Sequence, residues 1–74
     1  MRIEREYLEL GRNIYLIRRL RNINQKTLSD RVHMSRGSVA NVELGNQRLP
    51  LHLIPVFSEA LGVPVRDLMR GIFK

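Results

Sequence analysis

Residues 24–43 read NQKTLSDRVHMSRGSVANVE, and this stretch decides the fold. Its first residue is a favourable helix N-cap, and Leu28 and Val32 follow at the i, i+4 spacing of an inward helical face. The chain then turns near His33, and Ser35 can cap a second helix. We therefore expect two short helices joined by a tight corner.

The second helix of this pair has two contrasting sides. At about 100° per residue, Val39 and Val42 point to one side. The opposite side contains a guanidinium, an amide and two residues small enough for close approach, carried by Arg36, Asn41, Gly37 and Ala40. It contains no large apolar side chain. This composition is typical of a reader helix, which presents polar groups to a partner.

The positive charge is concentrated around the two short helices. The net charge of the chain is +6, and residues 11–48 contain eight basic residues against only Asp30 and Glu43, while charges elsewhere cancel. Solubility alone does not require positive charge to be concentrated in one segment, whereas the binding of a polyanion does. Nucleic acid is therefore the favoured partner, with an acidic membrane or an acidic protein as the alternatives.

Length and composition exclude several classes of protein. A chain of 74 residues is expected to form one domain, near the smallest size that a core sustains without metal or disulfide. It has no cysteine, which excludes disulfides and thiolate metal sites. No apolar run approaches the roughly 20 residues that cross a bilayer. The charged N-terminus lacks a secretory apolar region, so we expect a cytoplasmic protein without membrane contact.

Catalysis and metal binding have little support in the sequence. No serine, histidine and acid are spaced for nucleophilic chemistry, and no glycine-rich phosphate loop follows a strand. His33 and His52 are far apart in sequence without convergent carboxylates, which argues against a metal site. We expect no enzyme, no metal, no cofactor and no small-molecule ligand.

A long first helix is expected before the pair, from about Arg2 or Glu6 to Arg21, with a start near Tyr7 as the alternative. Its inward arc contains Ile3, Tyr7, Leu10, Ile14 and Ile17, widened by Leu16 and Leu20. Gly11 lies inside this helix at a cost of up to about 1 kcal/mol relative to alanine, so we expect another segment to pack closely against it.

Two helices are expected after the pair. The fourth begins at Leu51 or His52 and ends at Leu61, because Pro55 is tolerated only within the first helical turn. A short fifth helix follows over residues 64–69.

From Leu10 to Val63 the chain resembles the phage repressor and Cro group of helix-turn-helix proteins, the XRE family. Each matching element is weak alone, but their joint spacing is specific. The matching residues are Leu10-Gly11, Ile14, Ile17-Arg18, Ile23-Asn24-Gln25, Leu28, Val32, Ser35, Val39, Val42-Glu43, Gly45, Arg48, Pro50 and Ala60-Leu61-Gly62-Val63. The resemblance implies an all-α, compact five-helix bundle. Residues 1–74 would be one domain, with 24–43 as the helix-turn-helix unit and 1–9 as an N-terminal extension of the first helix.

The resemblance also implies that the third helix lies in the DNA major groove. Base contacts are then expected from Ser35, Arg36, Gly37, Ala40 and Asn41. Arginine fits the O6/N7 edge of guanine and asparagine fits adenine, each pairing contributing about 1–3 kcal/mol of discrimination. Gly37 departs from the usual polar residue and would let the backbone come closer. An ordinary solvated role for the arginine and the asparagine is the alternative.

Contacts to DNA phosphates are expected from a second set of residues, namely Gln25, Lys26, Ser38 and Arg48. Gln25 begins a helix whose backbone N–H groups favour an anion. The lysine and the second arginine flank the helix-turn-helix unit, although a plain solubility role for them is the alternative.

Two structural roles complete the expectations. In the family that the chain resembles, an arginine of the first helix pairs with the glutamate that ends the third, which implies a partly buried ion pair between Arg18 and Glu43. A homodimer on a palindromic operator is common in that family. Leu44, Ile72 and Phe73 are the candidates for the dimer interface.

The sequence therefore favours a sequence-specific regulator of transcription that binds double-stranded DNA, as a homodimeric repressor or autoregulator. One alternative is an antitoxin-like or adaptor protein that mainly binds another protein. The other is a general nucleic-acid binder, RNA included.

Overall fold

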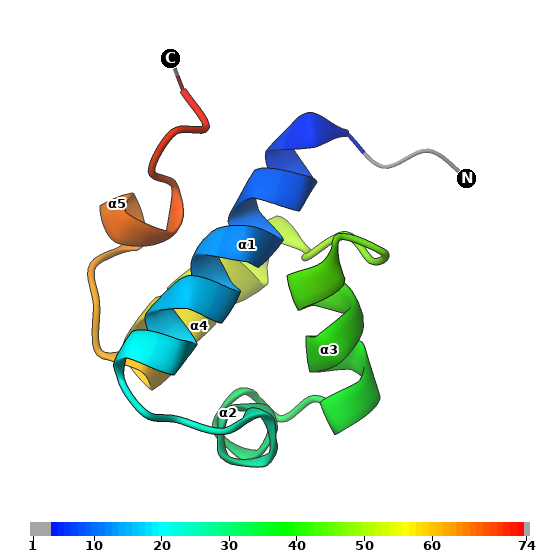
Figure 1. Cartoon of the computed structure of the whole chain (residues 1–74), viewed down its shortest axis with the longest axis vertical. Helices are drawn as coiled ribbons and strands as arrows, with labels where there is room; N and C mark the ends of the chain where they lie inside the picture. The colour runs from blue at the N-terminus through cyan, green and yellow to red at the C-terminus, as the bar shows by residue number, and fades with distance from the viewer. Residues whose placement is uncertain (1–3, 74) are drawn as a thin grey trace.

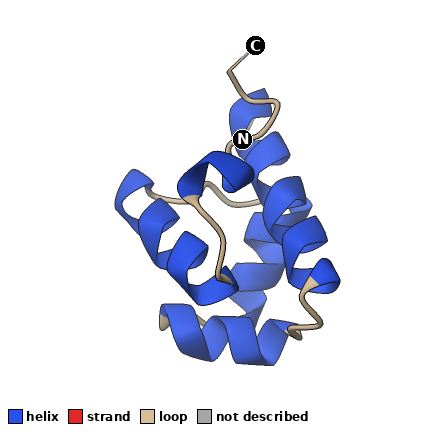
Figure 2. Ribbon diagram, turned by 90° about the vertical axis from the view of Figure 1, so that its left-hand side faces the viewer, coloured by secondary structure: helices blue, strands red, loops and turns tan. Residues whose placement is uncertain are grey.

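The apolar spacing of the sequence produces helices whose inner faces meet in one core. The computed structural model describes residues 4–73, and these form five α-helices and one 3-10 turn. The elements are α1 (Arg5–Leu20), α2 (Gln25–Val32), α3 (Arg36–Leu44), η1 (Leu51–Leu53), α4 (Ile54–Leu61) and α5 (Val65–Leu68). No strand occurs within that range, and Figure 2 shows helices joined by short loops. The expected all-α, five-helix fold is confirmed.

The first helix is the central element of the bundle. Figure 1 shows α1 running diagonally through the molecule, with α3 on one side, α5 on the other and α4 behind it. The core is lined by Leu10, Ile14, Leu28, Val32, Val39, Val42, Leu49, Ile54, Phe57, Leu61, Leu68 and Ile72. None of the helices in residues 4–73 is long and apolar enough to span a bilayer.

The first helix begins at Arg5, close to the expected start at Glu6. The other expected start, Arg2, lies outside the described residues, as does Ile3. The inward arc is narrower than expected, because the side chains of Leu16 and Leu20 are 44% and 82% exposed. The prediction that these two leucines face inward is wrong: α3, α4 and α5 all pack on α1, yet these contacts leave both leucines at the surface.

Gly11 lies where α1 crosses the backbone of α3. A Cβ atom added at Gly11 would collide with the carbonyl oxygen of Val42. The expected close approach to this glycine is therefore confirmed, and it explains why a residue with poor helix propensity occupies the middle of α1.

The corner between α2 and α3 is held by side-chain caps. The Oδ1 atom of Asn24 accepts a hydrogen bond from the backbone N–H of Thr27 at 2.8 Å, and Oγ of Ser35 accepts one from the N–H of Ser38 at 3.0 Å. These bonds satisfy donors that a helix N-terminus leaves unpaired. Between the caps, His33 adopts a left-handed conformation with φ of 57°. The chain therefore changes direction here, and Figure 1 shows α2 end-on with α3 beside it.

The segment after α3 differs from the expected continuous helix. Residues 51–53 form η1, and α4 begins only at Ile54. Pro55 has no N–H to donate to the carbonyl of Leu51, four residues earlier, and its ring would clash with that carbonyl in a continuous α-helix. The chain therefore tightens into a 3-10 turn, closed by the Leu53 N–H donating to the Pro50 carbonyl at 2.9 Å.

Candidate nucleic-acid interface

The two sides of α3 differ in exposure, as the helical spacing predicts. Val39 and Val42 are fully buried in the core. On the opposite side, Arg36 and Asn41 are exposed, and Ala40 is half-buried. Figure 1 shows α3 at the edge of the bundle, where the exposed Arg36 and Asn41 are accessible to a partner.

The start of α3 leaves its backbone accessible. Ser35 and Gly37 are exposed, and a Cβ atom added at Gly37 would meet no atom within 4 Å. The glycine is therefore not required by packing, in contrast to Gly11. Ser38 is half-buried, and its Oγ accepts a hydrogen bond from Oγ of Ser35 at 3.0 Å. The hydroxyl groups of the cap are thus engaged with each other in this structure.

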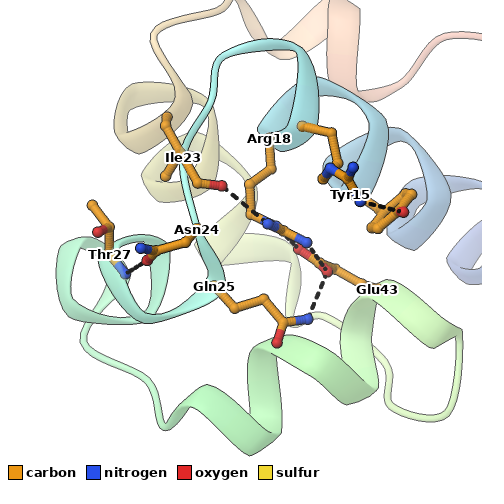
Figure 3. A network of polar contacts seen from close by, with 8 residues as sticks. Tyr15, Arg18, Ile23, Asn24, Gln25, Thr27 and Glu43 are labelled. Carbon is orange, nitrogen blue, oxygen red and sulfur yellow. Dashed lines mark hydrogen bonds and ion pairs between the residues drawn. The ribbon is translucent and has the colours of Figure 1, made fainter.

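A buried ion pair joins the reader helix to α1. The Nε and Nη2 atoms of Arg18 donate to the two carboxylate oxygens of Glu43 at 2.7 and 3.0 Å, as shown in Figure 3. Both side chains are more than nine-tenths buried. Arg18 also donates to the carbonyl oxygen of Ile23 at 3.0 Å. The structure thus brings together the two residues for which an ion pair was expected. The contact is bidentate, so the planar guanidinium and the planar carboxylate are held in one relative orientation.

Gln25 belongs to the same network. Its Nε2 atom donates to Oε1 of Glu43 at 3.0 Å (Figure 3). Within residues 4–73, no buried side-chain nitrogen or oxygen lacks a hydrogen-bond partner. The amide of Gln25, for which a phosphate contact was expected, therefore also links α2 to the ion pair of α1 and α3.

The two expected cationic phosphate contacts are each paired with an acid. Lys26 is exposed, and its Nζ lies 2.9 Å from Oδ1 of Asp30 on the next turn of α2. Arg48 donates to both oxygens of Glu4, at 3.0 and 2.6 Å. The hydrogen bond from Arg48 lowers the pKa of the Glu4 carboxyl below its usual value. A phosphate must therefore compete with a carboxylate for each of these two cations.

The three candidates for a dimer interface have different environments. Leu44 and Phe73 are exposed, the latter at 81%. Ile72 is only 6% exposed and belongs to the core. Ile72 thus packs mainly inside its own chain, because the turn after α5 folds back and brings it inward.

Sequence reasoning missed two contacts of α1. Asn13 donates from Nδ2 to the carbonyl oxygens of Leu68 and Arg70, at 2.6 and 2.9 Å, and so holds the end of α5 against α1. On another face, Nη1 of Arg19 donates to the hydroxyl oxygen of Tyr15 at 3.0 Å. The second contact has a sequence signal, its i, i+4 spacing, whereas the first joins residues that are distant in sequence.

Among residues 4–73, no group of three or more histidine, aspartate or glutamate side chains is arranged to hold a metal ion.

A family model described as helix-turn-helix matches residues 14–68 of this sequence, which is well over half of the chain. The chain belongs to the helix-turn-helix family. The domain is of the XRE/Cro-like type. Members of this family are DNA-binding transcription regulators rather than enzymes. Recognition of this family from the sequence is thereby confirmed.

Solved structures of helix-turn-helix regulators share the fold. The restriction-modification controller protein C.AhdI from Aeromonas hydrophila is 25% identical with a TM-score of 0.81, and the match covers 88% of this chain and 98% of that one. The clp gene regulator ClgR from Corynebacterium glutamicum is 22% identical with a TM-score of 0.83, covering 88% and 84%. The controller protein C.Esp1396I is 17% identical with a TM-score of 0.82, covering 96% and 99%.

One further match comes from a complex with DNA. A tetramer of C.Esp1396I bound to its natural 35-base-pair operator is 13% identical to this helix-turn-helix protein with a TM-score of 0.76, covering 90% and 99%. At such identity the likeness concerns the fold alone. Among curated proteins, none matches the sequence.

Proposed function

We propose that this helix-turn-helix protein is a sequence-specific regulator of transcription that binds a palindromic operator as a homodimer and acts as a repressor or autoregulator. The observation that carries the proposal is the two-sided exposure of α3. Arg36 and Asn41 extend from the side opposite the buried Val39 and Val42. These are the side-chain types that pair with guanine and adenine edges in the major groove.

The setting of α3 supports direct reading of bases. The bidentate contact between Arg18 and Glu43 ties the reader helix to α1, and Gly11 lets the two backbones touch. Side chains that read bases discriminate best when they project from an element whose orientation is already determined, since little ordering is then needed on binding. At the start of α3, the open space around Gly37 allows close approach of a nucleic-acid surface.

One solved structure with the same fold is a complex with DNA. The controller protein C.Esp1396I has been crystallised as a tetramer on its natural operator. A shared fold alone does not transfer a function, so the argument for this chain depends on the side chains of α3.

The homodimer is supported by an apolar groove at the chain termini. A groove of about 280 Å³ is lined by Tyr7, Leu10, Ile54, Met69 and Ile72, among others. The exposed Phe73 lies at this groove, as does Leu51, which is 80% exposed. In a two-fold dimer, the same surface patch of each copy forms the interface. Each copy would insert Phe73 at the groove of the other.

Operator selection tests base reading. A library of random duplexes should yield one palindromic sequence that the protein prefers over random duplex by about 10³ or more at fixed salt, with half-sites about 34–36 Å apart. Arg36→Ala and Asn41→Ala should relax the preference at defined base pairs, each by about 1–3 kcal/mol. Arg66→Ala, an exposed arginine of α5 that carries the same charge, is the matched control. Equal affinity for all duplexes would contradict sequence-specific regulation and indicate a general nucleic-acid binder.

Sedimentation equilibrium tests the dimer. Phe73→Ala should shift the protein toward monomer. Leu20→Ala is the matched control, because Leu20 is equally exposed, at 82%, but lines a different groove, between α1 and α5. A monomeric wild-type protein, or equal dimer dissociation constants for both variants, would contradict the proposed dimer surface.

A further inference from the structure

The basic residues around the reader helix are not equally available to a polyanion. Lys26 and Arg48 are each paired with an acid, and Arg18 is buried against Glu43. Arg12 and Arg19 are exposed, and neither forms an ion pair with any acid in residues 4–73. The uncompensated positive charge near α3 is therefore carried in large part by α1.

These two arginines share a face of α1 with an aromatic side chain. Residues at positions i, i+3 and i+7 lie along one side of an α-helix, and Arg12, Tyr15 and Arg19 have this spacing. The guanidinium of Arg19 lies 5.7 Å from the centre of the Tyr15 ring and donates a hydrogen bond to its hydroxyl oxygen. Stacking and hydrogen bonding together restrict the rotamers of both side chains, which lowers the entropy lost on binding a ligand.

This face of α1 borders the reader helix directly. A pocket of about 350 Å³ is lined by residues of three helices. They are Arg12 and Tyr15 from α1, Gln25 from α2, and Ala40, Glu43 and Leu44 from α3. Ala40 belongs to the side of α3 that the proposed function assigns to base reading. Figure 3 shows Tyr15 on α1 close to the buried network that joins α1 to α3. A duplex seated on α3 would thus bring its backbone close to this pocket.

We propose that Arg12, Tyr15 and Arg19 form a second phosphodiester-binding surface, which holds the nucleic-acid backbone beside the bases that α3 reads. The two guanidinium groups supply charged N–H donors to phosphate oxygens. The hydroxyl of Tyr15 accepts from Arg19, so its own O–H remains available as a donor to a phosphate oxygen. This inference rests on the proposed function, because it assumes that DNA binds at α3.

The experiment measures affinity for a short duplex of random sequence over a salt series, by fluorescence anisotropy with the full chain. Each lost phosphate contact should reduce the slope of log affinity against log salt by about 0.9. Arg12→Ala and Arg19→Ala should each show this reduction, and Arg12→Lys and Arg19→Lys should retain most of the wild-type slope. Tyr15→Phe should weaken binding without changing the slope, because no charge is lost.

Arg66→Ala is the matched control for net charge. Arg66 is exposed on α5, which lies on the opposite side of α1 from α3 (Figure 1), so its removal should leave the slope unchanged. Circular dichroism melting verifies that each variant folds. Wild-type slopes in both alanine variants, or an equal reduction in Arg66→Ala, would overturn the inference. Unchanged affinity in Tyr15→Phe would overturn the role of the hydroxyl.

The outcomes for this surface and for the proposed function are separable. A reduced slope on random duplex without any preferred operator supports this surface and contradicts sequence-specific regulation. A strong operator preference with wild-type slopes in both alanine variants contradicts this surface alone. A chain that binds no duplex at modest ionic strength contradicts both.

Discussion

The carboxylate of Glu43, near the end of α3, lies 2.7 Å from Nε of Arg18 on α1, in a site where both side chains are almost inaccessible to solvent. Burying a charged pair costs desolvation energy, and it is tolerated because each nitrogen of the guanidinium and each oxygen of the carboxylate has a hydrogen-bond partner. The carbonyl of Ile23 and the amide of Gln25 complete that matching. The pair thus gives α3 a defined position relative to α1.

Removing one partner of this pair should be strongly destabilising. Glu43→Ala leaves the Arg18 guanidinium buried without its counter-ion, and we expect a loss of about 3–5 kcal/mol in the free energy of unfolding. Urea denaturation measures this loss. Glu9→Ala is the control, because Glu9 pairs with Arg5 at the surface, where an ion pair contributes at most about 1 kcal/mol. A Glu43→Ala protein as stable as wild type would refute the architectural role.

Two helical glycines should respond in opposite ways to the same substitution. Gly11→Ala places a methyl group against the carbonyl oxygen of Val42, so it should destabilise the protein by about 1–3 kcal/mol despite the better helix propensity of alanine. Gly37→Ala enters open space and should stabilise it by up to about 1 kcal/mol. Thermal melting of the two variants provides the comparison. Equal shifts in melting temperature would contradict the assigned packing.

The Gly37→Ala variant also tests close approach to DNA. If the backbone of α3 touches the duplex at this point, the added methyl group should weaken operator binding even though the variant is more stable. Undiminished affinity would show that this glycine has no part in recognition.

The Glu4 carboxylate should compete with DNA phosphate for Arg48. Glu4 is ionised at neutral pH, and because the hydrogen bond from Arg48 lowers the pKa of its carboxyl, the ion pair is lost only as the pH falls through that lowered pKa. Glu4→Gln mimics this loss at neutral pH. It should raise duplex affinity and steepen the salt slope by about 0.9, since one competitor of phosphate is removed.

A double-mutant comparison isolates this competition. The effect of Glu4→Gln should disappear in an Arg48→Ala background. Glu6 is an exposed acid in the first turn of α1, two residues after Glu4, so Glu6→Gln removes the same charge and serves as the control. Equal gains in affinity from Glu4→Gln and Glu6→Gln would indicate a general charge effect instead.

Asn13 should stabilise the proposed dimer surface from a distance. Its amide binds the carbonyl oxygens of Leu68 and Arg70, just before the segment that carries Phe73. Asn13→Asp keeps the shape but cannot donate either hydrogen bond, so we expect a loss of about 1–3 kcal/mol in unfolding free energy. Sedimentation equilibrium should also show a larger dimer dissociation constant. A destabilised variant that dimerises as wild type would separate Asn13 from the interface.

Much of the candidate site follows from features that act over a few residues. The caps at Asn24 and Ser35 and the spacing of Val39 and Val42 determined two helices and the side of α3 that faces outward. The ion pair of Lys26 and Asp30 likewise follows from an i, i+4 spacing. Such features depend on helical geometry alone, which is the same in every helix.

What only the tertiary structure decided involves residues far apart in the chain. The partner of Gly11, the pairing of Arg48 with Glu4 and the inward position of Ile72 all depend on how the helices cross and where the chain ends fold back. Helical periodicity says which residues share a face but not which face of another helix meets it. The sequence therefore determined the reader helix and its polar side, whereas the packing of distant segments decided which of the surrounding charges are already compensated and which remain for a partner.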